Sequence, residues 1–327
     1  MTWRVWARIT GPKLPAEAVW IGAARVGPAP GEYRPPSPVQ LNVKWADGEQ
    51  SEYTTTSPRV AVTSDCWIIV EGVEARDNWA AISQVEEREI PAVVAALSAG
   101  RPEGAYRVEL VGADNGAEGF GVSPTVSTTA LPKSNLGSYE VIEAKTRMAL
   151  LLDHPSLTTA AELLYRGIRY SDMVAGPLSS AAAILAFYQV VESLATLIPW
   201  TPAEDYEVQR AQVVKVLRDK LARLGAVKKQ AAAIEEARNN LARLDARFGS
   251  LRIEHAAETF GINEAWIIRA RELGKLRNRS LGHAARLPSV AVLAEWDRVD
   301  GTEPFSAYGL ASVMLAAEFA HLSIPPT

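Results

Sequence analysis

Apolar and other residues alternate with a period of two in several segments near the start of the chain. Successive side chains of a strand point to opposite faces of a sheet, so this period predicts β-strands. Three segments show it: residues 3–9, 39–45 and 106–111. Residues 66–70 form a short continuous apolar run, which predicts a more buried strand. Loops are expected at residues 27–31 and 35–38, because proline donates no hydrogen bond to a sheet.

Helical spacing replaces this alternation elsewhere. Residues 77–98 predict a helix between two strands, with Asp77 as its N-cap and a new segment or kink at Pro91. Further helices are predicted at residues 140–152, 157–174, 179–198, 204–248, 264–276 and 307–322. The third of these is apolar nearly all round, which is typical of the centre of a bundle. The fourth suits one long amphipathic helix or a hairpin that turns near Gly225.

These patterns predict the α+β class, with a β-rich domain at residues 1–135 and an all-α bundle at residues 136–327. Residues 123–137 are rich in Ser, Thr and Pro and have no apolar period, so they are expected to link the domains. A length of 327 residues suits two domains of about 100–200 residues each.

Composition excludes several kinds of protein. Cys66 is the single cysteine of the sequence, which rules out an internal disulfide framework and a Cys-rich zinc module. The 4 histidines lie far apart, and no cofactor motif is present, so neither a metal nor a cofactor is expected. Arg4 and Arg8 interrupt the apolar core that a signal peptide needs. The most apolar stretch carries Gln189 and Glu192, which are costly in a bilayer, so a cytoplasmic protein without a membrane span is expected.

Charge is unevenly distributed. The net charge of the whole chain is −4, whereas residues 201–286 contain 17 basic and 11 acidic residues, a net charge of +6. An anionic partner is therefore expected to meet the C-terminal half. The alternative is a set of solvated helix faces, where such charges are common.

Most motifs that carry chemistry are missing. The sequence contains no nucleophile elbow, no P-loop and no zinc-protease helix. The glycines after the strand at residues 106–111 fit no phosphate-binding fingerprint, and residues 114–116 predict a turn. His255 and Glu258 are spaced as two metal ligands could be, but no other His or Cys lies near them, so they predict an exposed helical pair.

One segment stands out at the end of an apolar helix. Arg277, Asn278, Arg279 and His283 place two guanidinium groups, an amide and an imidazole close together in sequence. Arginine offers a planar fork of donors that suits phosphate oxygens. Histidine exchanges protons near neutral pH. Together these groups could cleave a phosphodiester without a metal, one moving the proton and another stabilising negative charge.

At this point the sequence resembles the HEPN superfamily (higher eukaryotes and prokaryotes nucleotide-binding). Its hallmark is an arginine, usually followed by Asn, His or Asp, with four to six residues in all between the arginine and a histidine. Arg277, Asn278 and His283 fit that pattern with five intervening residues. The apolar segment at residues 183–194 is similar to an earlier core helix of that family, which often carries an acidic residue, here Glu192. The β-rich domain ahead of the helices is similar to the layout of ApeA-like HEPN proteins.

The resemblance implies a metal-independent endoribonuclease that acts on RNA as a homodimer through its helical domain. His283 would be the general base or acid, Arg277 would stabilise the transition state, and Asn278 would orient the phosphate or the histidine. Arg279 and Glu192 would support them. The products would be a 2′,3′-cyclic phosphate and a 5′-hydroxyl. The layout suggests a toxin or antiviral-defence effector, whose β-rich domain answers an unknown trigger or ligand.

Helix geometry leaves alternatives open. On a continuous helix, Arg277 and His283 lie about 120° apart, whereas Arg279 and His283 share a face. Either Gly282 breaks the helix and re-aims His283, or Arg279 is the working arginine, or the site is degenerate. The last case gives a second function: a non-catalytic module that binds RNA or nucleotide or mediates dimerisation. A third possibility is a structural subunit of a defence complex.

Overall fold

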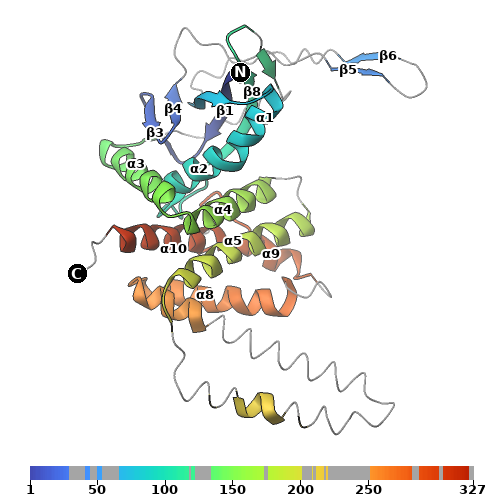
Figure 1. The fold of residues 1–327 in the computed structure, drawn as a ribbon. Coiled ribbons are helices and arrows are strands. Elements are labelled where there is room, and N and C mark those ends of the chain that lie inside the picture. Colours follow the sequence, from blue (N-terminus) through green and yellow to red (C-terminus); the bar gives the residue numbers. More distant parts are fainter. Residues whose placement is uncertain are drawn as a thin grey trace.

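Two of the three alternating segments lie in a six-stranded antiparallel sheet, and most of the remaining described chain is helical, which confirms the α+β class (Figure 1). The structure is a computed structural model that describes residues 1–28, 41–44, 50–53, 66–117, 119–121, 134–172, 176–200, 208, 211–216, 219, 251–281, 287–301 and 305–323. The sheet order is β3-β4-β7-β1-β8-β9. Its strands are β1 (Thr2–Thr10), β3 (Val19–Ile21), β4 (Ala24–Pro28), β7 (Cys66–Glu74), β8 (Arg107–Asp114) and β9 (Gly119–Gly121). Two small pairs accompany it: β2 (Lys13–Leu14) with β10 (Ser134–Asn135), and β5 (Leu41–Lys44) with β6 (Gln50–Tyr53).

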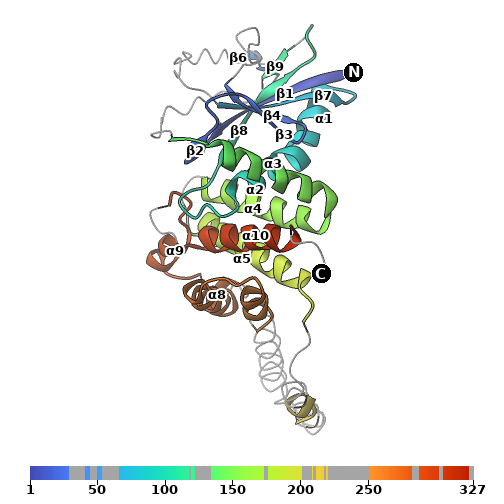
Figure 2. The same ribbon diagram turned by 90° about the vertical axis from the view of Figure 1, so that its left-hand side faces the viewer.

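The helices begin beneath the sheet and continue away from it in layers, and α8 lies farther from the sheet than α4, α5 and α10 (Figure 2). The first group is α1 (Asn78–Gln84), the π-helical turn η1 (Val85–Glu89) and α2 (Ile90–Ser98). The second group is α3 (Ser138–Asp153), α4 (Ser156–Asp172), α5 (Pro177–Leu197), α8 (Glu264–Leu276), the π-helical turn η2 (Arg277–Leu281), α9 (Val290–Trp296) and α10 (Ala307–Leu322). Residues 251–259 are also helical.

Most predicted elements are confirmed. All four predicted strands are present, as β1, β5, β7 and β8. Asp77 caps α1, since its Oδ1 accepts a hydrogen bond from the backbone N–H of Ala80 at 2.8 Å. Pro91 stands at the start of α2, directly after η1. Five of the helices predicted beyond residue 139 appear as α3, α4, α5, α8 and α10. Of the sixth, only residues 208, 211–216 and 219 are described and are helical, and Gly225 lies outside the described residues.

The predicted loop at residues 27–31 is wrong at its first two positions. Strand β4 runs to Pro28, which lies opposite Cys66 of β7. The backbone of Ala18 passes so close to Gly27 that an added Cβ would lie 2.5 Å from the Ala18 Cα, so glycine lets the strand continue. Pro28 is the last strand residue, where a missing N–H interrupts no further pairing. The rest of that segment and the other proline-rich segment lie outside the described residues.

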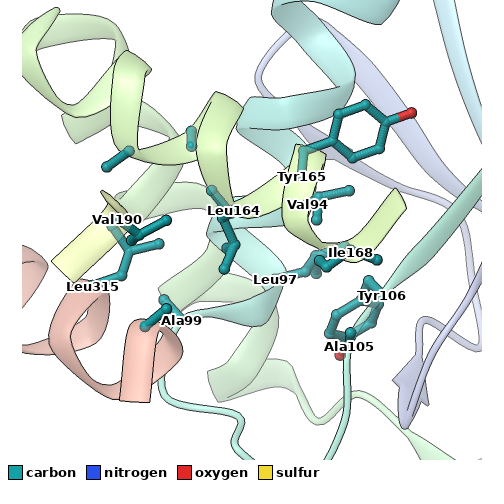
Figure 3. Packing of buried hydrophobic residues seen from close by; sticks show 14 of the residues in the cluster. Val94, Leu97, Ala99, Ala105, Tyr106, Leu164, Tyr165, Ile168, Val190 and Leu315 are labelled. Carbon is teal, nitrogen blue, oxygen red and sulfur yellow. The ribbon is translucent and has the colours of Figure 1, made fainter. Parts of the chain in front are cut away.

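A single hydrophobic core connects the sheet to the helices. Strand β1 points Val5 and Ile9 toward the helices, and both belong to the same buried cluster as α2, α4, α5 and α10. Val94 of α2 lies near Leu164 and Tyr165 of α4 (Figure 3). The opposite face of the sheet carries a separate small cluster of Trp6, Trp67 and Ile69.

The predicted division at residue 135 therefore falls where the core is continuous, and it stays a prediction. Most of the predicted linker, residues 123–133, lies outside the described part of the chain. Its end is structured, because β10 pairs with β2 in parallel and Gly137 precedes α3.

Helix α5 lies at the centre of the helical layers, as predicted. It packs against α4, α9 and α10. The ring of Phe187 contacts Gly167 of α4, where an added Cβ would lie 2.5 Å from that ring, and Phe187 meets Tyr308 of α10 edge-on at 5.7 Å. By length and composition, α5 is the one helix in the described ranges that could cross a membrane, and its central stretch is more than half buried by protein.

A partly buried ion-pair network holds α3 against the end of α2. The Arg101 guanidinium contacts the Glu140 carboxylate at 3.0 Å and Glu103 at 3.5 Å, and it is 9% exposed. Glu140 also accepts hydrogen bonds from Lys13 Nζ at 2.8 Å and from the Gly137 backbone N–H at 2.7 Å. These donors join three separate segments through one carboxylate.

This network predicts a loss of stability in acid. Hydrogen bonding from Lys13, followed by Gly137 and Arg101, lowers the pKa of Glu140 from its ordinary value near 4.5 to about 2. The ionised carboxylate therefore stabilises the fold above pH 4.5, and that contribution disappears as the pH falls from 4.5 toward 2. Allowing for solvent screening, we expect this group to account for about 1–2 kcal/mol of the unfolding free energy.

The variant Glu140→Gln is expected to unfold at lower urea concentration at pH 7 and to lose less stability than wild type between pH 5 and pH 2.5. Glu143→Gln on the same helix is the control, because Glu143 makes a longer contact of 3.6 Å with Arg147. Equal acid sensitivity in wild type and Glu140→Gln would contradict the assigned role.

Candidate active site

The candidate arginine lies where a regular helix becomes a π-helical turn. Asn263 caps the N-terminus of α8, since its Oδ1 accepts a hydrogen bond from Ala265 N–H at 2.9 Å. At the other end, the Arg277 backbone N–H donates to the carbonyl oxygens of Gly274 and Leu273, and η2 begins there. π-Helical turns are rare and frequently occur at functional sites. Angles computed for a regular α-helix therefore do not apply across residues 277–281.

The Arg277 side chain is half-buried and lies against α5. Its Cζ is 5.6 Å from the ring centroid of Tyr188, and its Nη1 donates a hydrogen bond to Asn278 Oδ1 at 3.0 Å. Its Nε is buried without a hydrogen-bond partner. Within the described ranges, Arg277 makes no ion pair. No carboxylate of the described residues therefore lies within ion-pair distance, 4.0 Å, of its guanidinium.

Glu192 lies one helical turn beyond Tyr188 on α5 and is partly exposed. Burial, followed by the Glu192 carboxylate, raises the pKa of Tyr188 to about 12, while the Arg277 guanidinium opposes this change. Both charged groups therefore act on the same phenol. The structure brings Glu192, Arg277 and Asn278 to one location, beside Tyr188.

The remaining predicted residues are only partly described. The backbone of Arg279 belongs to η2, but its side chain lies outside the description, as does the whole of His283. The pairing of an arginine with His283 therefore stays a prediction. Tyr188 was missed because a tyrosine in an apolar helix has the pattern of a core residue. Its spacing of four residues from Glu192 is the signal that could have identified it.

The other sequence candidates have structural roles. The turn predicted at residues 114–116 connects β8 to β9, and Asp114 Oδ1 accepts a hydrogen bond from the Gly116 N–H at 3.2 Å. Glu258 is exposed, and the ring centroid of His255 lies 6.5 Å from that of Trp200. Among the described residues, no group of three or more His, Cys, Asp or Glu side chains could hold a metal ion.

A second feature is an open groove of about 590 Å³ between η1 and α4. Its lining residues are Glu86, Glu87, Pro91, Glu162, Tyr165, Arg166, Arg169 and Tyr170. Arg169 forms an ion pair with Glu86 across it and lies over the Tyr165 ring at 5.9 Å. The groove shares no residue with the Arg277 site, and its stacked arginine is already neutralised by a carboxylate.

Comparisons with protein-family models, with curated proteins and with solved structures gave no match.

Proposed function

We propose that the chain is a metal-independent endoribonuclease of the HEPN type. The observation that carries the proposal is a half-buried arginine, Arg277, that has a hydrogen bond to Asn278 but no carboxylate partner among the described residues. A guanidinium in such a setting attracts an oxyanion strongly, because its donors and its charge are available and partly shielded from water. A phosphodiester is the anion whose geometry suits that fork of donors.

In the proposed reaction the ribose 2′-oxygen attacks the adjacent phosphorus. The new O–P bond forms as the bond to the 5′-oxygen breaks, which leaves a 2′,3′-cyclic phosphate and a 5′-hydroxyl. His283 removes the proton from the 2′-hydroxyl or delivers one to the leaving 5′-oxygen. Arg277 stabilises the additional negative charge on the phosphorane, and Asn278 orients the phosphate. A 2′-hydroxyl is required, so RNA is the substrate and DNA is not.

The assembly belongs to the same proposal. A homodimer formed through the helical half would bring two copies of the motif together. The N-terminal half would regulate the nuclease in response to a trigger, in a cytoplasmic toxin or defence effector. The basic charge of residues 201–286 supports RNA as the partner.

The proposal is tested with purified wild type, Arg277→Ala, Arg279→Ala and His283→Ala on labelled RNA and on DNA of the same sequence, with EDTA present. We expect wild type to cut RNA alone and to leave cyclic phosphate ends. Loss of His283 and of one arginine should each lower the rate at least about 100-fold. Arg271→Ala is the matched control on the same helix, since Arg271 pairs with Glu254 at 2.9 Å. Full cleavage by both Arg277→Ala and His283→Ala would overturn the mechanism.

A non-catalytic RNA-binding module is the second candidate. It is favoured by the available donors of Arg277, which can hold a phosphate whether or not a proton is transferred. Binding that weakens steeply with salt and depends on Arg277, without any cleavage product, would select this function.

A further inference from the structure

We infer that Tyr188 is a positioning residue that holds the Arg277 guanidinium ready for an oxyanion while leaving its charge available. The ring of Tyr188 faces Arg277 at 5.6 Å, within the range of a cation–π contact. The catalytic consequence rests on the proposed function, whereas the positioning itself does not.

Tyr188 differs from its neighbours on α5. The buried residues of that helix are Ala181, Ala183, Ile184, Ala186, Phe187, Tyr188, Val190, Val191, Leu194 and Ala195. Tyr188 alone among them carries a polar atom in its side chain, and it is 3% exposed. A leucine or phenylalanine would satisfy a purely apolar core. The phenol instead interacts electrostatically with both the Arg277 guanidinium and the Glu192 carboxylate.

A comparison within the chain shows what is unusual about Arg277. In the described ranges, the arginines that lie over aromatic rings are Arg8, Arg169, Arg269 and Arg277. The first three also contact carboxylates: Arg8 contacts Glu109, Arg169 contacts Glu86, and Arg269 contacts Glu272 and Glu295. Arg277 has the ring without a described carboxylate. A carboxylate would fix an arginine and cancel its charge, whereas a neutral ring fixes it and leaves the charge to an incoming anion.

The position of Tyr188 is itself fixed by the adjacent residue. Phe187 is fully buried between Gly167 and Tyr308, so the backbone of α5 cannot shift without a clash at that point. The raised pKa of Tyr188 also keeps its hydroxyl un-ionised over the physiological range. No phenolate therefore forms beside Arg277 to compete with a bound anion.

The test replaces Tyr188 with Phe and with Leu and follows the Arg277 side-chain N–H resonance by NMR, together with the affinity for inorganic phosphate. The variant Arg277→Lys lacks the Arg277 side-chain N–H signal and so identifies that resonance in the wild-type spectrum. Tyr188→Phe keeps the ring, so the resonance should stay near its wild-type position and phosphate affinity should change less than about 3-fold. Tyr188→Leu should move the resonance to that of a mobile arginine and weaken phosphate binding about 10-fold. Tyr165→Leu is the matched control for the other stacked arginine. The Arg169 resonance should stay near its wild-type position, because Arg169 retains Glu86 as its partner.

If Tyr188→Leu does not fold, fluorinated phenylalanines at position 188 provide a second test in a folded protein. They weaken the negative ring face at nearly constant size, so phosphate affinity should fall with each added fluorine. Affinity that is independent of fluorination, or an Arg277 resonance unchanged in folded Tyr188→Leu, would overturn the inference. In an RNA-cleavage assay, Tyr188→Leu should lower kcat about 10-fold and Tyr188→Phe should restore it. If wild type cuts no RNA, the proposed function fails, while the resonance and phosphate measurements still decide the role of Tyr188.

Discussion

Replacing Gly301 with alanine is expected to lower the free energy of unfolding by about 3 kcal/mol or more. Gly301 has a φ of 78°, a backbone conformation that L side chains rarely adopt. An added Cβ would lie 1.8 Å from the carbonyl oxygen of Glu103, and that oxygen is backbone, so no side-chain rotation relieves the clash. The neighbouring hydrogen bond from Ala105 N–H to Val299 O, at 2.7 Å, holds the two segments together and resists their separation.

Gly261→Ala separates the free-energy penalty of the positive φ from the penalty of the steric clash. Gly261 has a φ of 67° and no heavy atom within 4 Å of an added Cβ. It carries the conformational penalty without the clash, so its variant should lose about 1 kcal/mol. Urea unfolding at pH 7 measures both variants. Equal losses for Gly301→Ala and Gly261→Ala would show that the chain relaxes around residue 301 and that the contact with Glu103 does not constrain the fold.

The period-two segments of β1 and β8 were predicted correctly because one face of the six-stranded sheet is buried against helices. In β1, Val5 and Ile9 point into the main core, and Arg4 and Arg8 point to the other face. A strand with two different faces has a clear period in its sequence. The hairpin of β3 and β4 was missed because its strands are too short for such a period to emerge.

Other elements depend on partners far away in the sequence. Strand β10 consists of Ser134 and Asn135, which form a strand only because β2 lies beside them. The segment that contains them has the composition of a loop, so no local signal distinguishes it. Helix α9, at Val290–Trp296, was missed for a related reason. It is only 7 residues long, and Trp296 is buried by tertiary contacts that the local sequence pattern does not predict.

The candidate site also combines residues that the sequence predicts with features that depend on packing. The sequence identifies Arg277 and Asn278, because a guanidinium and an amide at a helix end are chemically conspicuous. The resemblance named Glu192 as a supporting residue, and the structure puts its helix, α5, beside η2. The π-helical turn could not be predicted, since it depends on how the end of α8 packs. Tyr188 was not recognised, because its contact with Arg277 arises from the packing of η2 against α5, which the sequence does not show.

Leu164→Ala is expected to destabilise the whole protein by about 3 kcal/mol. Leu164 is completely buried on α4 and lies in the layer between α2 and α5 (Figure 3). Removing its side chain leaves a cavity that rigid neighbours such as Leu97 cannot fill. Leu178→Ala is the control, since Leu178 is 74% exposed and its loss should change stability by less than about 0.5 kcal/mol.

The same variant tests whether the two halves of the chain are separate domains. If the core is one cooperative unit, a cavity at Leu164 lowers hydrogen-exchange protection in β1 and β7 as much as in α4, because all three open in the same global unfolding. If the predicted division at residue 135 is also a folding boundary, protection falls in α4 and α5 while β1 and β7 keep theirs. Hydrogen exchange of wild type and Leu164→Ala under matched conditions distinguishes these outcomes. The shared cluster that joins Val94 and Leu97 of α2 to α4 favours a single cooperative unit. The same apolar core continues from the sheet to the helices that carry Arg277.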